Sequence, residues 1–348
     1  SGDTDSGDTD SGDDGDAGGD LSGTLIGAGA SSQAAAMQGW QAGFQNLNAD
    51  VTVEYDPIGS GGGRDTFIEG GSDFAGSDSL LDDEEYEASV DRCEGDQGAI
   101  HLPHYISPVV VAYNLPGVDS LNLSPETVAG IFAGEITNWT DEAIVADNPD
   151  ADLPDLAVNA VHRSDESGTT ENFTDYLATV APDIWTYGLV GEWPIDSGEG
   201  APQTSGVVAA ISAGEGSIGY SDASQVPDDL GVADIGVGGE FVEYSPDAAS
   251  RLVEVSEQIE GRSEYDLGFN LTRDTEESGV WPIALVSYHI VCLEYPDQDT
   301  VDLVKAFMTY VASEEGQQAS AESAGSAPIG DGLRERVMDS IDQVIVAG

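Results

Sequence analysis

The sequence predicts an α/β protein with two domains. Stretches with the alternating apolar pattern of strands are followed along the chain by stretches with a helical apolar stripe, the order expected of α/β folds. The 348 residues, 39% of them hydrophobic, suffice for two buried cores. The longest apolar run, residues 280–293, is interrupted by a proline and falls short of the roughly 18 residues of a membrane-spanning helix. It is therefore predicted to be a buried strand.

The charge balance is extreme and narrows the classes of function. The chain carries 67 acidic residues against 9 Lys plus Arg, a net charge of −58. This charge excludes a general affinity for nucleic acids or anionic membranes. The carboxylates are spread over segments with folded character, and multimolar salt reduces the screening length to about 3 Å. We therefore predict a protein from an extreme halophile.

Cysteine and histidine give little sign of a metal or cofactor. Cys93 and Cys292 are too few for a disulfide framework and wrongly spaced for zinc. They form one bridge in an oxidising compartment or remain two buried thiols, and the sequence leaves both open. The four histidines also lack metal-ligand spacing. The prediction is a protein without a metal or cofactor.

The first 20 residues differ in composition from the rest. They contain SGDTD twice and then SGDDGD, which cannot bury apolar surface, so residues 1–20 are predicted to be a disordered acidic linker. Such a linker is expected after the lipidated cysteine of a surface lipoprotein. We therefore expect the extracellular face of the membrane as location, with a lipid anchor on an N-terminal cysteine absent from this sequence.

The first third of the folded chain contains two strand–helix pairs. Residues 21–26 are extended, and Met37, Trp40, Phe44 and Leu47 form the apolar stripe of the following helix. Residues 51–55 alternate as a strand. A glycine-rich loop then leads into a short helix, and its glycines are expected to let the backbone approach a ligand. A turn of small residues is expected at 73–79.

The later strands and helices are predicted from the same kinds of apolar pattern. Proline at the first helical position marks a helix from residue 125, and hydrophobic periodicity indicates the others. Strands are predicted at 107–113, 156–163, 217–220 and 280–293; helices at 207–212, 301–313 and 333–346; a polar region up to about 279; and a Gly/Ala/Pro connector between the last two helices.

The stretch 162–170 is the strongest candidate for a binding site. It lies between a predicted strand and a helix whose inward face carries Phe173 and Leu177. Ser167 and the residues after it therefore lie at a helix start, where free N–H groups, the helix dipole and hydroxyls favour an anion. Arg163 can donate two parallel hydrogen bonds to a tetrahedral oxyanion, and Asp165 can hold its guanidinium.

Three loops together resemble a known family, the phosphate-binding subunit of the high-affinity phosphate ABC transporter. The matching stretches are residues 27–31, residues 58–63 through 73–78, and residues 163–170 with 172–174, supported by 111–117, 131–139 and 281–283. They follow the family's order and cover nearly everything after residue 20. The set is far more specific than any single loop.

The resemblance implies a two-lobed fold of the periplasmic-binding-protein type (type II), with a hinged cleft that closes on one phosphate. Lobe 1 would comprise residues 21–106 and 278–348, and lobe 2 residues 107–277. The phosphate-binding residues carried over are Ser31, Ser32, Ser60, Asp78, Arg163, Ser167, Gly168 and Thr169, with Asp165 supporting the arginine.

Two positions depart from the family pattern. Ser32 stands where the family has phenylalanine, which keeps the backbone donor but loses an aromatic wall. Glu166 stands where the family often has a small residue, and we expect its side chain to point into solvent. Arg163 is the only positive charge expected in the cleft.

The implied function is extracytoplasmic binding of inorganic phosphate by a monomer that delivers it to the membrane permease of an ABC importer. The nearest alternative is a binding protein for another tetrahedral oxyanion such as sulfate. Asp78 counts against it, because sulfate has no proton to offer a carboxylate. A hydrolase lacks a nucleophile motif here, so no enzyme is expected, and a surface scaffold or adhesin is the remaining alternative.

Overall fold

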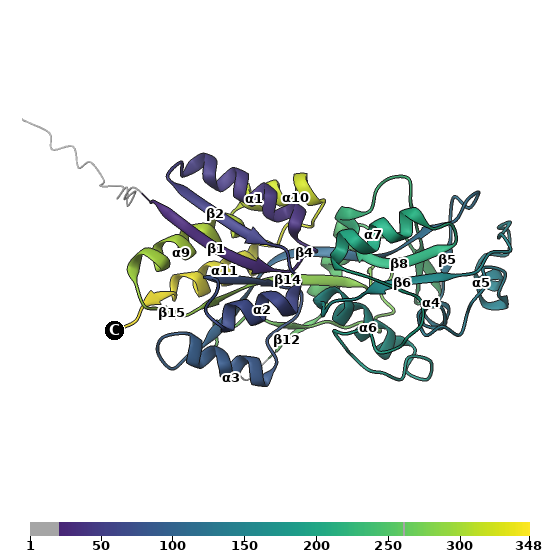
Figure 1. The fold of residues 1–348 in the computed structure, drawn as a ribbon, viewed down its shortest axis with the longest axis horizontal. Helices are drawn as coiled ribbons and strands as arrows, with labels where there is room; N and C mark the ends of the chain where they lie inside the picture. Colours follow the sequence, from purple (N-terminus) through teal and green to yellow (C-terminus); the bar gives the residue numbers. More distant parts are fainter. Residues whose placement is uncertain (1–20, 260–261) are drawn as a thin grey trace, which may run out of the picture.

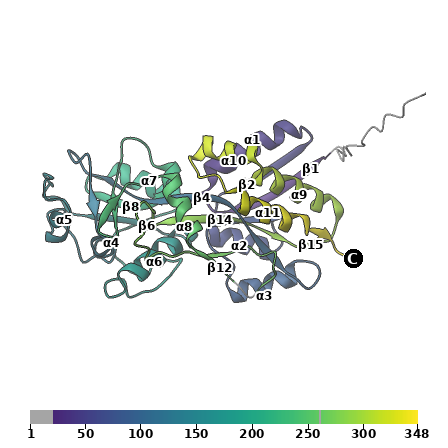
Figure 2. The same cartoon turned by 180° about the vertical axis from the view of Figure 1, so that it is seen from behind.

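The fold of the computed structural model is α/β and two-lobed (Figure 1), and it describes residues 21–259 and 262–348. The linker expected at residues 1–20 lies outside the described residues. One lobe holds the N-terminal and C-terminal elements, and the other holds the middle of the chain. Helices flank the strands in both lobes, as Figure 2 shows from behind.

The main sheet has nine strands and runs through both lobes, and three small sheets, β11-β10-β5, β12-β13 and β15-β16, lie outside it. The order of the main sheet is β2-β1-β3-β14-β4-β8-β6-β7, with β9 paired to β4. The strands are β1 (Gly23–Gly29), β2 (Val51–Asp56), β3 (Phe74–Ser77), β4 (Ala99–Asn114), β6 (Asn159–Arg163), β7 (Glu199–Ala201), β8 (Ser217–Asp222), β9 (Gly231–Val232) and β14 (Ala284–Cys292).

Strand β4 connects the lobes. Its first part, up to Pro108, pairs antiparallel with β14, and its second part, from Val109, pairs antiparallel with β8. The strand is buried on both faces over nearly its whole length, which explains why residues 109–112 form an apolar run instead of alternating. The sequence indicated only the second part, because histidines and prolines interrupt the first.

Among the residues that the structure describes, six helices and a small parallel strand pair cover the strands of the first lobe. These are α1 (Ala34–Leu47), α2 (Ser60–Ile68), α3 (Asp83–Arg92), α9 (Gln298–Ala312), α10 (Glu314–Ala324) and α11 (Asp331–Asp342), with β15 (Glu294–Tyr295) and β16 (Ile345–Val346). In α1 the side chains of Met37, Trp40 and Phe44 are buried as expected, whereas Leu47 is 61% exposed at the helix end. The connector expected between the last two helices instead contains α10.

The remaining described elements come from the middle of the chain; most lie in the second lobe, and the last two pair with each other beside the first lobe. They are β5 (Asn122–Leu123), α4 (Pro125–Phe132), α5 (Glu142–Asp147), α6 (Gly168–Val180), α7 (Gln203–Ala213), the 3-10 turn Ala223–Gln225, β10 (Asp234–Val237), β11 (Glu240–Val242), α8 (Pro246–Glu254), β12 (Glu257–Gln258) and β13 (Phe269–Asn270). The aromatic rings of Phe132, Phe173 and Tyr220 pack together in the core of the second lobe.

Part of the middle segment contacts the first lobe. The carboxylate of Asp266 accepts hydrogen bonds from the backbone and ring of His101, and the N–H of Leu267 bonds the carbonyl of His101. Residues 266–267 thus attach to β4 on the first lobe's side. The lobe boundaries expected from the sequence remain a prediction.

The cysteines form a disulfide. Cys93, just after α3, is bonded to Cys292 at the end of β14, with Cα atoms 5.4 Å apart. The bridge joins segments 199 positions apart in the first lobe. It resolves the two possibilities that the sequence left open. Among the described residues, no helix is long and apolar enough to cross a bilayer.

Candidate functional site

The site is built where strands β1, β3 and β6 end and helices α2 and α6 begin. Close packing of α2 against β1 depends on glycine, because a Cβ on Gly63 would lie 2.3 Å from the Cα of Gly29. The glycine-rich loop therefore serves backbone packing within the lobe as well as approach to a ligand. Ser60, the first residue of α2, is held next to the end of β3 as a result.

The loop after β1 faces both Asp78 and the second lobe. Ser32 donates hydrogen bonds of 2.7 Å to the carboxylate oxygens of Asp78. The hydroxyl of Ser31 lies 3.0 Å from that of Thr204 in the second lobe and accepts a hydrogen bond from the Thr204 N–H. Helix α1 begins only at Ala34, with Gln33 at its N-cap, so Ser31 lies before the helix and does not cap it.

Asp78 is the carboxylate at the centre of the site. It directly follows β3, is 5% exposed, and its N–H donates to the hydroxyl of Ser60 over 3.1 Å. Thr169 of the second lobe also donates to the carboxylate, over 3.1 Å. Burial raises the pKa of Asp78 above its ordinary value, while hydrogen bonds from hydroxyl groups and the charge of Arg163 oppose that rise.

Arg163 ends β6 and is held rigidly by the carboxylate two residues later. Its Nε donates to Asp165 over 2.8 Å, and its Nη2 pairs with the second oxygen of the same carboxylate. Burial raises the pKa of Asp165, but the hydrogen bond and charge of Arg163 outweigh it and hold that pKa below the ordinary value. The two contacts orient the plane of a guanidinium that is only 2% exposed.

The start of α6 lies directly against the first lobe. Ser167 caps the helix by accepting a hydrogen bond from the N–H of Thr170. A Cβ on Gly168 would lie 2.6 Å from the hydroxyl of Ser60 and 2.8 Å from the Cβ of Asp78. Only glycine fits this close approach of the two lobes.

The structure thus brings all eight expected site residues together. The seven that carry side chains beyond glycine are at most 5% exposed. Hydroxyl groups, one oriented guanidinium and the starts of two helices surround a single buried carboxylate. Such a set of donors suits an anion that carries a proton.

The comparisons with known proteins agree with this geometry. A model of the PBP superfamily domain matches residues 14–315. Phosphate-binding protein PstS 3 of Mycobacterium leprae is 35% identical over 329 residues, covering 92% of this chain and 87% of that protein. This chain belongs to the PstS family.

Solved structures share its fold. A high-affinity periplasmic phosphate-binding protein, PfluDING, solved with bound phosphate, aligns with a TM-score of 0.71 at 22% identity, covering 90% of this chain and 93% of that one. The phosphate-binding protein from Stenotrophomonas maltophilia aligns with a TM-score of 0.68 at 21% identity, covering 91% and 93%.

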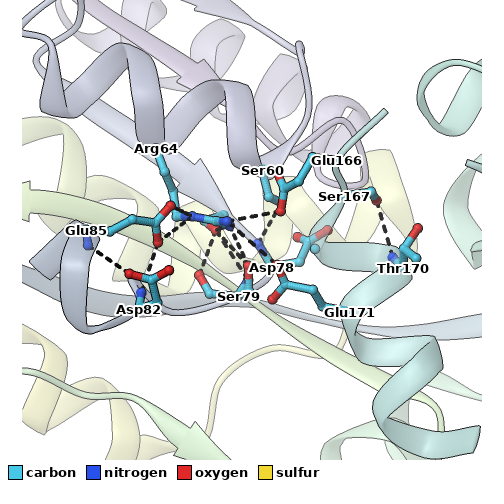
Figure 3. A network of polar contacts seen from close by, with 12 residues as sticks. Ser60, Arg64, Asp78, Ser79, Asp82, Glu85, Glu166, Ser167, Thr170 and Glu171 are labelled. Carbon is cyan, nitrogen blue, oxygen red and sulfur yellow. Dashed lines mark hydrogen bonds and ion pairs between the residues drawn. The ribbon is translucent and has the colours of Figure 1, made fainter. Parts of the chain in front are cut away.

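Arg64 is a second buried guanidinium in the cleft of this PstS-family chain, and the sequence interpretation missed it. From α2 it donates to Glu85 over 2.9 Å and to the hydroxyls of Ser77 and Ser79 in its own lobe, and to Glu166 over 3.1 Å across the cleft (Figure 3). Its Nη2 also lies 3.6 Å from Glu171 of α6. The expectation that Arg163 is the only positive charge in the cleft is therefore wrong.

The expectation that Glu166 points into solvent is also wrong. Its Oε1 contacts Arg64, its Oε2 is buried, and its side chain is only 30% exposed. The guanidinium of Arg64, in the other lobe, attracts Glu166, and the sequence around Glu166 does not reveal this partner. One signal was present: Arg64 lies four residues after Ser60, on the same face of a short helix that leads from the site.

Three further residues complete the contact between the lobes. Asn172 donates to the backbone carbonyls of Asp78 and Gly168 over 2.7 and 2.8 Å. Arg273 binds the side-chain oxygen of Asn172 and pairs with Asp175 at 2.9 Å. Asn172 also begins the glycosylation motif Asn-Phe-Thr, and the burial of its amide leaves no access for a glycan there.

Proposed function

We propose that this protein binds one inorganic phosphate between its lobes and delivers it to the membrane permease of an ABC importer. Its function is then binding and transfer, with no chemical step. The PstS relatives are named phosphate-binding proteins. The observation that carries the proposal is Asp78, a buried carboxylate set among hydroxyl donors and beside Arg163.

Asp78 explains why phosphate is favoured over sulfate. Near neutral pH phosphate keeps at least one proton, and an ionised Asp78 can accept it in a charge-assisted hydrogen bond. Sulfate would place a bare oxygen against the carboxylate, with no proton between them. The repulsion acts selectively against the wrong ligand.

We assign the ligand contacts to the eight residues named from the sequence, with Asp165 supporting Arg163. The guanidinium supplies the charged contact, and the starts of α2 and α6 supply backbone N–H groups and the positive ends of their dipoles. About ten donors at roughly 0.5–1.5 kcal/mol each readily reach the −8 kcal/mol of a micromolar dissociation constant. One positive side chain in contact with the ligand, that of Arg163, is then sufficient for this affinity.

Further proposals concern the source of the protein, its membrane anchor, its oligomeric state and the boundaries of its lobes. The net charge of −58 supports an origin in an extreme halophile. The Ser/Gly/Asp composition of residues 1–20 supports a lipid anchor and a place on the outer face of the membrane. We also propose that the protein acts as a monomer, with lobes divided near residues 106 and 278. The contacts of Asp266 and Leu267 favour moving residues 266–267 to the first lobe.

Equilibrium dialysis in high salt tests the function. Labelled phosphate should bind with a stoichiometry of one and a dissociation constant in the micromolar range or below. Excess sulfate should leave it bound, and excess unlabelled phosphate should displace it. Displacement by sulfate at equal concentration would favour the oxyanion alternative, and absence of binding would favour a scaffold role.

A further inference from the structure

A row of buried polar side chains lies behind Asp78, inside the first lobe. Gln33, His104, Ser287 and His289 are each at most 1% exposed. None of them belongs to the proposed ligand contacts. Two adjacent imidazoles in an otherwise apolar core need a reason, because each buried polar atom must find a partner.

These side chains form one continuous chain of hydrogen bonds. Nδ1 of His104 lies 2.9 Å from Nδ1 of His289, and Nε2 of His289 lies 3.0 Å from Oε1 of Gln33. The amide nitrogen of Gln33 donates to the hydroxyl of Ser287 over 2.9 Å. Ser287 lies beside Asp78, because the next residue, Tyr288, pairs with Ser77 at the end of β3, and its hydroxyl acts to lower the pKa of the Asp78 carboxyl.

The protons along this chain can be assigned from chemistry. The amide oxygen of Gln33 only accepts, so Nε2 of His289 carries a hydrogen. Burial lowers the pKa of His289 to about 3, so its ring is neutral and its Nδ1 is a bare acceptor. His104, whose pKa burial also lowers, must then donate from its Nδ1.

The groups at both ends of this hydrogen-bond chain disfavour donation in the opposite direction. Nε2 of His104 is buried without a partner, and the assignment above leaves only a lone pair there. Reversing every bond would place an N–H at that atom, and orphaned buried donors are rarer than orphaned acceptors. Reversal would also turn the proton of Ser287 toward Gln33 and its lone pairs toward the carboxylate of Asp78.

We propose that the hydroxyl of Ser287 is a fixed donor to Asp78 and that Gln33 holds it in this role. Ser287 has one proton, and the amide of Gln33 occupies its acceptor side, so the proton points at the carboxylate. Ser287 and Gln33 are therefore positioning residues that act on phosphate selectivity through Asp78. The inference deepens the proposed function and rests on it.

Ser287, like Ser32, has a role that a donor from the second lobe cannot fill. It lies on β14, which pairs with β3 just before Asp78, so both groups belong to the first lobe. The Thr169 donor comes from the second lobe and withdraws when the cleft opens. Ser287 keeps stabilising the ionised carboxylate in the open protein, before the ligand arrives.

Gln33→Glu tests the direction of the chain. A carboxylate at residue 33 accepts from both His289 and Ser287, so the proton of Ser287 leaves Asp78 while the shape is kept. We expect the ratio of phosphate to sulfate affinity, measured by calorimetry in about 3 M potassium chloride, to fall about tenfold. In an Asp78→Asn background the same change should alter the ratio less than about twofold, because the two sites are coupled through Ser287.

Ser287→Ala tests the same claim without placing a charge in the core. Sulfate affinity as a function of pH is the readout, because sulfate itself does not titrate above about pH 4 and gains affinity when Asp78 is protonated. Loss of a donor raises the pKa of Asp78, so the midpoint should move about one pH unit higher. Tyr55, Arg163 and Asp222 also face Asp78 and stay unchanged. The dependence of sulfate affinity on pH in Asp78→Asn measures the contribution of these other groups.

Ser320→Ala is the matched control, since it also removes a buried hydroxyl in the first lobe, one that is bonded to Ser326 and takes no part in this hydrogen-bond chain. This variant should leave unchanged both the ratio of phosphate to sulfate affinity and the pH midpoint of sulfate binding. An unshifted midpoint in Ser287→Ala, or an equal effect of Gln33→Glu with and without Asp78, overturns the inference while phosphate binding stands. Absence of phosphate binding by the wild type would overturn the proposed function itself.

Discussion

Arg163 should contribute more to phosphate affinity than any single hydroxyl. Its guanidinium is oriented by Asp165, whereas the guanidinium of Arg64 is already paired with Glu85 and Glu166. We expect Arg163→Ala to weaken phosphate binding by at least about 2–3 kcal/mol, on the order of a hundredfold. Arg163→Lys should recover only part, because an ammonium cannot form the two-pronged contact. Equal affinities of wild type and Arg163→Ala in calorimetry would refute the assignment.

Asp78 should control the choice between phosphate and sulfate. Asp78→Asn places a donor in nearly the same shape, so phosphate affinity should fall modestly while sulfate affinity rises by several kcal/mol at most. The ratio of the two affinities, measured by competition, should collapse. A variant that still rejects sulfate as strongly as the wild type would show that Asp78 is not the discriminating group.

At the scale of single residues, the site could be predicted only through the resemblance of whole loops. Arg163 and Ser167 also carried a local physical signal, since a strand end followed by a helix start makes an anion site. Arg64 and Glu166 could not be paired, because 102 positions separate them and their contact exists only in the folded cleft. The same holds for Ser287 and Gln33, which are 254 positions apart.

At the scale of elements, the contact of α2 with α6 makes closure sensitive to pH. Burial raises the pKa of Glu171, the charge of Arg64 opposes this, and the neighbouring Glu166 raises it further; the pKa ends above its ordinary value. Opening the cleft hydrates Glu171 and restores that ordinary value. The closed form then binds more protons than the open form, so closure is favoured at low pH and weakens as pH rises toward the raised pKa.

Glu171→Gln isolates this effect. The dissociation constant of the wild type, divided by that of the variant, should increase as pH rises from about 5 to about 8, by at most tenfold per pH unit. Taking the ratio cancels the titration of phosphate itself. Glu322→Gln, which alters a solvent-facing carboxylate on α10, is the control. Parallel pH profiles of wild type and Glu171→Gln would contradict the assignment.

The elements themselves differ in how well the sequence predicts them. Helix α1 and strand β14 have strong apolar patterns and were predicted within a few residues. Helix α10 has a composition of Ala, Ser, Gln and Glu with no clear stripe, and it is stabilised by packing on α1 and α9. Helix α8 was missed within a polar region although it has an apolar face, on which Leu252 and Val253 are buried, and a serine cap followed by proline at its start.

At the scale of the whole molecule, folding should depend on salt. A net charge of −58 generates self-repulsion that only screening removes. Near-ultraviolet circular dichroism in potassium chloride, lowered from about 3 M to about 0.1 M, should show loss of tertiary structure at the low end. An unchanged melting temperature across this range would contradict the halophilic interpretation. Phosphate salts must be avoided, because ligand binding would mask the effect.

The sequence supported the α/β class and the order of strands and helices, because these follow from local periodicity. The single sheet running through both lobes did not follow from it, since β4 pairs with β14 and then β8 over long separations. Contact between the lobes is likewise a property of the folded molecule. It depends on groups such as Asn172 and Arg273 that carry no distinctive local pattern.

The most direct test of the central claim is a crystal structure determined with phosphate in high salt. We expect one tetrahedral ion between the lobes, bonded to the guanidinium of Arg163, to N–H groups at the starts of α2 and α6, and to the carboxylate of Asp78. Phosphate found elsewhere on the protein, with the cleft between Asp78 and Arg163 free of it, would contradict the proposed site.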